Sequence, residues 1–195
     1  MAKQKAKSKD KQGKSAVKEF LMIFLMAAIL AVFLKCFIVD SRVIPSSSMV
    51  PTIQIGDRVV LNKLSYLGDA APQRGDIVVF KPNASTGSHY DMIKRVIGLP
   101  GDRVEINNGY VYINGEPLEE DYLAEAPRYY FEEITVPEGC YFLLGDNRNY
   151  SNDAHMWLDP FVTEKSIEGK ATLCYWPLSR IGSLYAAPQN EAEQE

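Results

Sequence analysis

The sequence predicts a mainly β protein, folded as a coiled or barrel-like antiparallel sheet, behind one helix that crosses a membrane. Residues 20–39 form a single apolar run. Beyond it, short runs rich in Val, Ile and aromatic residues are separated by Gly, Pro and Asn, which is typical of strands and turns. Outside 20–39 no segment keeps a 3.6-residue apolar period, so we expect one β domain there.

The apolar run is long enough to be a membrane anchor. Every residue from Phe20 to Val39 is apolar except Lys35, and twenty helical residues span about 30 Å, the thickness of the hydrocarbon layer. Lys35 lies near the far end, where a long side chain reaches the headgroups. A cleavable leader would have a shorter apolar core and a small-x-small exit. The run therefore predicts a retained anchor.

Charge on the two sides of this run predicts its orientation. Seven lysines lie within residues 3–18 beside Asp10, whereas Arg42 is the basic residue just after the run. Basic flanks stay in the cytoplasm, so the β domain is expected outside the cell membrane. The whole chain carries a net charge of −4, which argues against nucleic acid as a partner. We expect membrane lipid as a partner instead.

These observations divide the chain into four parts. We expect a lysine-rich cytoplasmic tail at 1–19, the anchor at 20–39, an extracytoplasmic catalytic domain at 40–185 and an acidic flexible tail at 186–195. A small extra lobe is expected around 107–140.

Seven strands are predicted within the β domain. They lie at residues 57–63, 75–80, 92–97, 103–106, 110–113, 141–144 and 171–176. Asn108-Gly109 is a strong hairpin signal between the fourth and the fifth. Loops are expected at 70–74, 83–89 and 119–128.

The cysteines and histidines give no sign of metal or redox chemistry. Cys36, Cys140 and Cys174 form no CxxC pair, and His89 and His155 stand apart. No metal or other cofactor is therefore predicted. Cys140 and Cys174 are either paired in an oxidising exterior or two free thiols, and the sequence leaves both open.

A serine–lysine protease is the chemistry that the motifs favour. A serine nucleophile needs a base, yet no Gly-x-Ser-x-Gly elbow accompanies either histidine. Lys94 lies in an apolar run, and strand alternation puts it on the face of Met92 and Val96, where loss of water lowers a lysine pKa. Taken singly, a turn serine at 48, a solvated lysine at 94 and a capping serine at 151 are ordinary features. Their joint order after an anchor is not.

Four segments together resemble type I signal peptidases, the membrane-bound serine endopeptidases that remove signal peptides from exported preproteins. The segments are Pro45–Thr52 with Gly56-Asp57, Gly75–Phe80, Lys94–Val104 and Gly145–Arg148. The chain looks similar to the short bacterial form with one anchor. The resemblance implies the coiled antiparallel fold that this family shares with repressor-type proteases.

The resemblance also implies roles. Ser48 would be the nucleophile and Lys94 the general base. The Ser48 N–H and the Ser46 hydroxyl would hold the oxyanion, and Ser151 would orient the lysine. Structural roles fall to four residues of the last segment: Asp146, Asn147, Arg148 and Asp153.

At one position the chain departs from the family pattern. The family usually follows the aspartate with Ser-Arg, whereas this chain has Ala154-His155 after Asp153. Either His155 takes the place of the arginine or it faces solvent, and a structural rather than a catalytic role is expected for both Asp153 and His155.

The expected substrate pocket is shallow and apolar. Its predicted lining is Ile44, Pro45, Met49 and Ile93. Such a pocket suits small residues before the cleavage site, in an Ala-X-Ala-like pattern. An extended peptide is expected to add as a strand beside the lysine segment.

Two other interpretations compete with the peptidase. A self-cleaving protease of the repressor type shares the fold and the dyad, but such proteins are soluble and the run at 20–39 argues against it. A membrane-tethered binding module without activity would not need Ser46, Ser48, Lys94 and Ser151 together.

Overall fold

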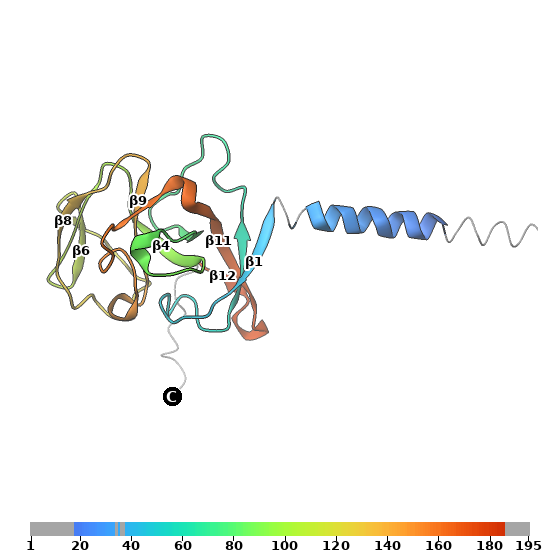
Figure 1. The fold of residues 1–195 in the computed structure, drawn as a ribbon. Coiled ribbons are helices and arrows are strands. Elements are labelled where there is room, and N and C mark those ends of the chain that lie inside the picture. The colour runs from blue at the N-terminus through green and yellow to red at the C-terminus, as the bar shows by residue number, and fades with distance from the viewer. Residues whose placement is uncertain (1–17, 34, 36–37, 186–195) are drawn as a thin grey trace, which may run out of the picture. The chain divides into compact units, whose positions relative to one another are not determined.

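The computed structural model describes residues 18–33, 35 and 38–185. The chain forms two compact units, with the boundary between Val39 and Asp40. Figure 1 shows the elements of each unit.

The first unit is helical over residues 18–33. Its large apolar side chains between Phe20 and Phe33 are exposed. Within the described part of the chain, no helix is both long and apolar enough to cross a membrane. The anchor predicted at 20–39 includes residues 34, 36 and 37, and the predicted tails include 1–17 and 186–195. All of these lie outside the described residues.

The strands and the single turns of 3₁₀ helix lie in the second unit, except that the first strand begins at Val39, the last residue of the first unit. The strands are β1 Val39–Val43, β2 Arg58–Asn62, β3 Ile77–Phe80, β4 Met92–Gly98, β5 Arg103–Asn107, β6 Tyr110–Ile113, β7 Glu116–Pro117, β8 Phe131–Thr135, β9 Cys140–Leu144, β10 Phe161–Thr163, β11 Ile167–Trp176 and β12 Gly182–Ser183. The 3₁₀ turns are η1 Ala84–Thr86, η2 Arg148–Tyr150, η3 Glu164–Ser166 and η4 Leu178–Arg180.

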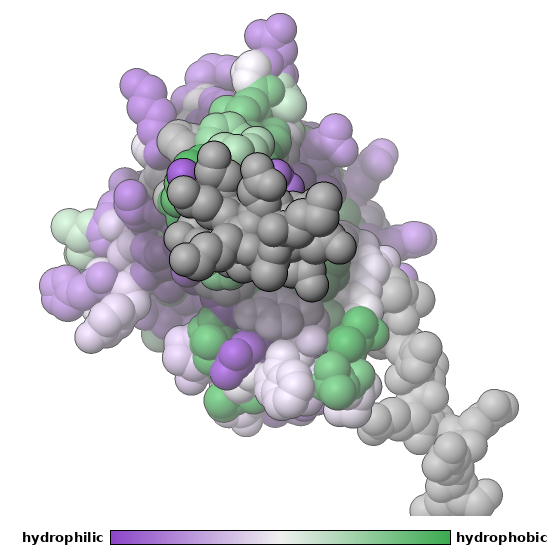
Figure 2. Space-filling model, turned by 90° about the vertical axis from the view of Figure 1, so that its right-hand side faces the viewer, coloured by the Kyte–Doolittle hydropathy of each residue, from purple (hydrophilic) through white to green (hydrophobic). Residues whose placement is uncertain are grey.

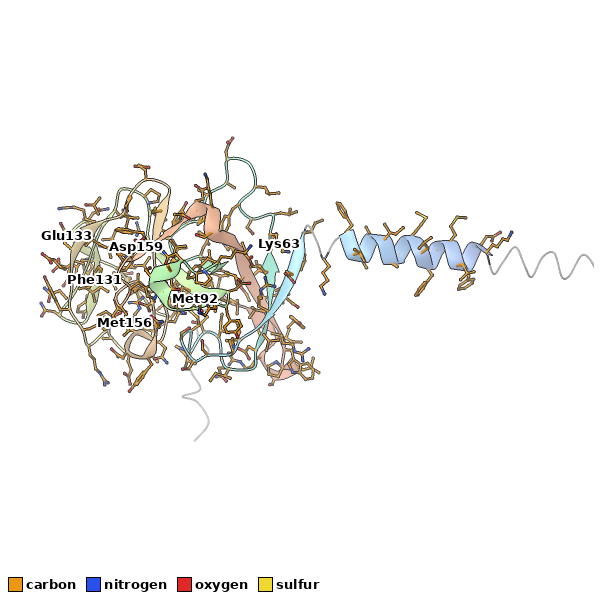
Figure 3. All side chains as sticks on the ribbon, viewed as in Figure 1. Lys63, Met92, Phe131, Glu133, Met156 and Asp159 are labelled. Carbon is orange, nitrogen blue, oxygen red and sulfur yellow. The ribbon has the colours of Figure 1, made fainter. Side chains whose placement is uncertain are left out.

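The described residues form two antiparallel sheets. The larger has the order β1-β2-β11-β3-β4-β9-β10, with β12 paired to β11, and the smaller has the order β7-β6-β5-β8. Figure 3 marks Met92 on the larger sheet and Phe131 and Glu133 on the smaller one. Strands β6, β7 and β8 of the smaller sheet lie within residues 107–140, where an extra lobe was expected, whereas β5 begins at Arg103.

The long strand β11 joins two parts of the larger sheet. It pairs with β3 near its start and with β2 from Lys170 onward. A Cβ at Gly169 would lie 2.5 Å from the carbonyl oxygen of Asn62. Only glycine allows this close backbone approach, so it permits the strand to change partners.

The central strand β3 separates two hydrophobic clusters. Val78 and Phe80 belong to the cluster that also holds the smaller sheet's Val104 and Ile106, while Ile77 and Val79 belong to the cluster around Met49. All four β3 side chains are buried. Because successive strand residues alternate faces, the larger sheet is covered on both sides at this point.

All seven predicted strands form, within a few residues of the predicted bounds. Five strands were not predicted: β1, β7, β8, β10 and β12. In β8 the exposed pair Glu132-Glu133 lies in the middle of the strand, and the register against β5 shifts between Val104 and Ile106. This irregularity hides the two-residue period by which a strand is found.

Candidate active site

A folded turn after β1 holds Ser48 over the core. The Ile44 N–H donates to Asp57 O at 2.9 Å and the Gly56 N–H donates to Ile44 O at 2.8 Å, which closes the loop. Met49, next to the serine, is fully buried. Burial of this neighbour fixes the turn, and Ser48 itself is only 7% exposed.

Lys94 lies in the middle of β4 and meets Ser48. Its Nζ donates to Ser48 Oγ at 2.8 Å and to Ile93 O at 3.0 Å. In the register of β3 and β4, Lys94 is opposite Val78, so its side chain leaves the sheet on the Val78 face. The two residues are 46 positions apart in the chain, and only the sheet brings them together.

The lysine is buried without an ion-pair partner among the described residues. Burial lowers the pKa of Lys94 to about 8, against the opposing effect of the negative charges of Asp153 and Asp146. The physical cause is the loss of water around the ammonium, which disfavours the charged form. A lysine with this pKa is partly neutral at mildly alkaline pH, so its nitrogen can accept a proton.

Gly145 provides the space in which these groups meet. Arg95 is paired with Leu144 in β9, so the next position in that register sets Gly145 beside Lys94. A Cβ at Gly145 would lie 2.2 Å from Ser151 Oγ and 2.4 Å from Ser48 O. The missing side chain therefore lets the serine turn and Ser151 pack against the end of β9.

Two hydrogen bonds join the serine turn to the segment after β9. The Asn147 N–H donates to Ser48 O at 3.0 Å, and Asn147 Nδ2 donates to Ser47 O at 3.1 Å. They hold the carbonyl oxygens of Ser47 and Ser48 in place.

The remaining serines of the predicted site lie close by. Ser46 Oγ is 3.4 Å from Ser48 Oγ, and Ser46 is exposed. Ser151 is 3% exposed, and its Oγ has no hydrogen-bond partner among the described residues. The expected hydrogen bond from Ser151 to the lysine is thus not formed here, and its orienting role stays a prediction.

The four residues predicted to line a substrate pocket differ in exposure. Ile44, Met49 and Ile93 belong to one buried cluster, with exposed fractions of 2%, 0% and 7%. Pro45 is exposed. Met49 is therefore a core residue in this structure, and the pocket also stays a prediction.

Arg95, the neighbour of Lys94, lies in different surroundings. Its guanidinium makes two hydrogen bonds to Asp146, at 2.8 and 2.7 Å. Thr52 Oγ1 also donates to Asp146, at 2.5 Å, and the Tyr122 ring stacks 3.8 Å from the guanidinium carbon. Burial opposes the charge on Arg95, yet the contact with Asp146 leaves its pKa raised.

The loop after β7 contacts the segment after β9 through a second arginine, Arg148. Arg148 is completely buried and pairs with Glu120, one of the two bonds measuring 2.7 Å. Arg148 Nε also donates to Gly145 O at 3.2 Å. Residues 119–128 were predicted only as a loop, so Glu120 and Tyr122 were missed. Their acidic and aromatic character was visible in the sequence, but their partners were not.

Asp153 and His155 form the last contact of the site. His155 Nδ1 is 2.6 Å from Asp153 Oδ1, and Asp153 Oδ2 accepts the Gly145 N–H at 2.8 Å. The imidazole stacks on the Tyr129 ring, with centroids 3.8 Å apart. Of the two open possibilities for His155, the structure therefore has the one in which it pairs with the aspartate.

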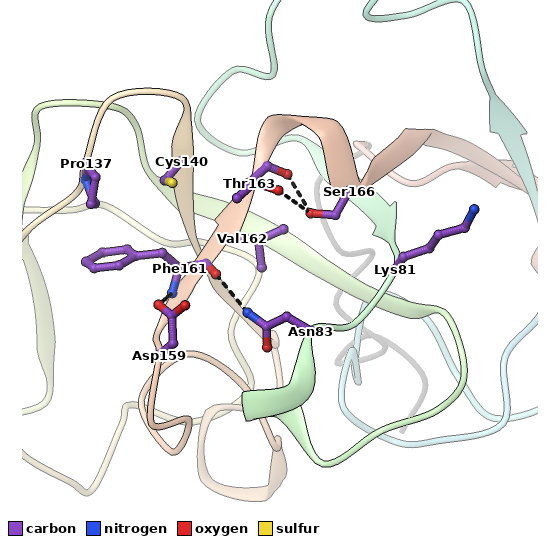
Figure 4. A pocket seen from close by; sticks show the side chains of 9 residues that line it. All are labelled: Lys81, Asn83, Pro137, Cys140, Asp159, Phe161, Val162, Thr163 and Ser166. Carbon is purple, nitrogen blue, oxygen red and sulfur yellow. Dashed lines mark hydrogen bonds between the residues drawn. The ribbon is translucent and has the colours of Figure 1, made fainter.

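A separate cavity of about 310 Å³ lies away from these residues. Figure 4 shows its lining, which includes Lys81, Cys140 and Ser166. None of the predicted site residues lines it. Cys140 and Cys174 are both free thiols, and no group of His, Cys, Asp and Glu among the described residues is arranged to hold a metal ion.

Comparison with known proteins places this arrangement in a family. The family model described as signal peptidase, peptidase S26, matches residues 17–176. The chain belongs to this family. It is accordingly a serine endopeptidase of the signal peptidase I class.

Two named relatives agree with the family model. Two probable signal peptidases I of Synechocystis are each 45% identical to this chain, one over 82% of the chain and 73% of its own length, the other over 86% and 87%. A crystal structure of a signal peptidase I from Enterococcus faecalis covers 53% of this chain and 98% of its own, with 39% identity and a TM-score of 0.46.

Proposed function

We propose that this enzyme removes signal peptides from exported preproteins with a serine–lysine dyad, in which Ser48 is the nucleophile and Lys94 the general base. The observation that carries the proposal is the 2.8 Å contact between Lys94 Nζ and Ser48 Oγ in a buried setting. Neutral Lys94 takes the hydroxyl proton as Ser48 Oγ attacks the scissile carbonyl. The resulting ammonium then gives the proton to the leaving amine, and an acyl-enzyme remains.

Water completes the cycle by the same route. Neutral Lys94 takes a proton from the attacking water, and Ser48 leaves as the hydroxyl when the ester is hydrolysed. In both steps the oxyanion is held by the Ser48 N–H and the Ser46 hydroxyl, donors whose removal typically costs about 3 kcal/mol of transition-state stabilisation. The position of Ser46 Oγ, 3.4 Å from the nucleophile, supports this role.

The substrate residues before the cleavage site are proposed to be small, as in an Ala-X-Ala-like pattern. The apolar residues Ile44 and Ile93 flank the dyad in the chain and are nearly closed to solvent. Side chains packed this closely suit a small substrate residue better than a large one. A peptide series that varies the residue before the scissile bond from Ala to Leu tests this: Ala should be cleaved and Leu should not.

Membrane attachment is also part of the proposal. We propose residues 20–39 as the anchor, 1–19 as the cytoplasmic tail, 40–185 as the extracytoplasmic catalytic domain and 186–195 as a flexible tail. Large exposed apolar side chains after β11, such as Leu178 and Ile181, suit a lipid surface. Figure 2 shows one face of the molecule, where green apolar side chains interrupt a mainly hydrophilic surface. Protease added to spheroplasts should digest the β domain. If the domain were digested only after the cells are lysed, the proposed orientation would be refuted.

One assay tests the dyad directly. The detergent-solubilised full chain is incubated with a preprotein, as wild type, Ser48→Ala and the neighbour control Ser47→Ala. Ser48→Ala should abolish cleavage while Ser47→Ala retains it. The reverse result would assign the nucleophile to the other serine. Activity in both variants would refute the serine mechanism proposed here.

A further inference from the structure

His155 contacts Asp153, an acidic residue whose negative charge favours the ammonium form of Lys94. Asp153 is fully buried, and among the described residues His155 is the only basic side chain that contacts its carboxylate. The contact measures 2.6 Å at Nδ1, and the His155 N–H reaches the same oxygen at 3.3 Å.

The imidazole is held in place from the other side. It lies against the Tyr129 ring at 3.8 Å, with an angle of 12° between the planes, and its side chain is only 13% exposed. Tyr129 comes from the loop between β7 and β8, whereas His155 follows η2. Figure 3 labels Met156, the residue that follows His155 in the chain. The ring therefore has little freedom to leave Asp153.

The other charges around the lysine are already paired. Asp146 is bound by Arg95, and Arg148 is bound by Glu120. Tyr129 has its pKa raised, first by burial and then by the charge of Asp153, so it stays neutral. Asp153 is left as the acidic group whose contacting side chain is a histidine, a residue type that exists in a neutral and a charged form.

We propose that His155 is a positioning residue for Lys94: through its contact with Asp153 it sets how much negative charge the buried lysine meets. This inference rests on the proposed role of Lys94 as the base. When His155 is neutral, the carboxylate keeps its full charge and favours the ammonium form of the lysine. When His155 is charged, that field is partly cancelled and the lysine releases its proton more easily. An arginine in its place would cancel the field at every working pH.

The test is the pH dependence of kcat/KM for the full chain in detergent, with an Ala-X-Ala peptide as substrate. His155→Arg supplies a permanent positive charge and His155→Gln a neutral hydrogen-bond donor. We expect the acid limb of His155→Arg to lie about half a pH unit or more below that of His155→Gln, with wild type at or between them. His89→Arg, at the exposed second histidine, is the matched control and should leave the limb unmoved.

Three results decide the matter. Limbs that coincide in the two His155 variants would overturn the inference, even if both variants lost activity, because a purely structural role lowers the rate equally at all pH values. A shift equally large in His89→Arg would also overturn it. If thermal unfolding shows that the His155→Arg variant is not folded, His155→Lys supplies the same positive charge. Lys94→Met in the same series separates the two proposals: if it cleaves, the base assignment fails, and if it does not, only the inference is at stake.

Discussion

Two neighbouring cations on β4, Lys94 and Arg95, have opposite electrostatic surroundings. Both are buried, with exposed fractions of 3% and 4%. Arg95 meets a carboxylate and keeps its charge, while Lys94 meets a hydroxyl and a carbonyl and has its pKa lowered to about 8. Burial alone does not make a base. The difference lies in whether a counter-ion is supplied, and strand alternation directs the two side chains to opposite faces.

The largest expected effect separates activity from stability at Lys94. Lys94→Met keeps the length of the side chain and removes the amine, so cleavage should fall by at least about a thousandfold, since the base is lost. Unfolding free energy should stay the same or rise, because a buried amine without a counter-ion is costly to the fold. Peptide cleavage and urea unfolding measure the two. Lys81→Met, at an exposed lysine, should change neither.

Arg95→Met should give the converse result. It leaves Asp146 buried without its cation, and breaking such a pair typically costs about 3–5 kcal/mol. The unfolding midpoint in urea should drop sharply at neutral pH. If Arg95→Met were as stable as wild type, Asp146 would have another source of compensation and the contrast between the two cations would fail.

Gly145→Ala tests the space between the serine turn and β9. Its Cβ would lie within 2.4 Å of the Ser48 backbone oxygen, so the turn must shift and the dyad distance must change. We expect a loss of about a hundredfold in kcat, since a displacement near 1 Å has that order of effect. Gly182→Ala is the matched control, because a Cβ at that position would have nothing within 4 Å. Equal activity in both variants would exclude a tight role for Gly145.

Ser151→Ala should have a smaller and more selective effect. If Ser151 orients the lysine, kcat should fall by about tenfold to a hundredfold. Because its Oγ lacks a hydrogen-bond partner among the described residues, stability should not decrease. A variant that loses stability but keeps its rate would assign Ser151 to packing alone.

Lys94 should also make the stability of the protein depend on pH. Its folded pKa of about 8 lies below the unfolded value of about 10.4. Between these values the unfolded chain binds more protons, so this group's contribution to stability rises with pH across that window. Below about pH 8 the full penalty for the buried ammonium is present. The free energy of unfolding of wild type should therefore increase more from pH 7 to pH 10 than that of Lys94→Met. An equal change in the two proteins would contradict the lowered pKa of Lys94.

The sequence predicted local features best. Seven strands followed from β-type runs and turn residues, because those patterns depend on neighbours in the chain. The Ser48 and Lys94 candidates followed from motif order, and an apolar run around Lys94 indicated burial. Strand β8 was missed because Glu132-Glu133 and a shifted register interrupt its alternation.

The sequence by itself thus determined the β class, the order of the motifs and the family. The tertiary structure decided which buried arginines have a counter-ion, Arg95 in Asp146 and Arg148 in Glu120, and that His155 contacts Asp153. It also decided that Lys94 meets Ser48 rather than a carboxylate. The physical reason is distance along the chain. The residues that contact β4 and the segment after β9 come from strands and loops that the sheet register brings together. A local sequence pattern indicates that a side chain is buried, but it does not indicate which residues surround it.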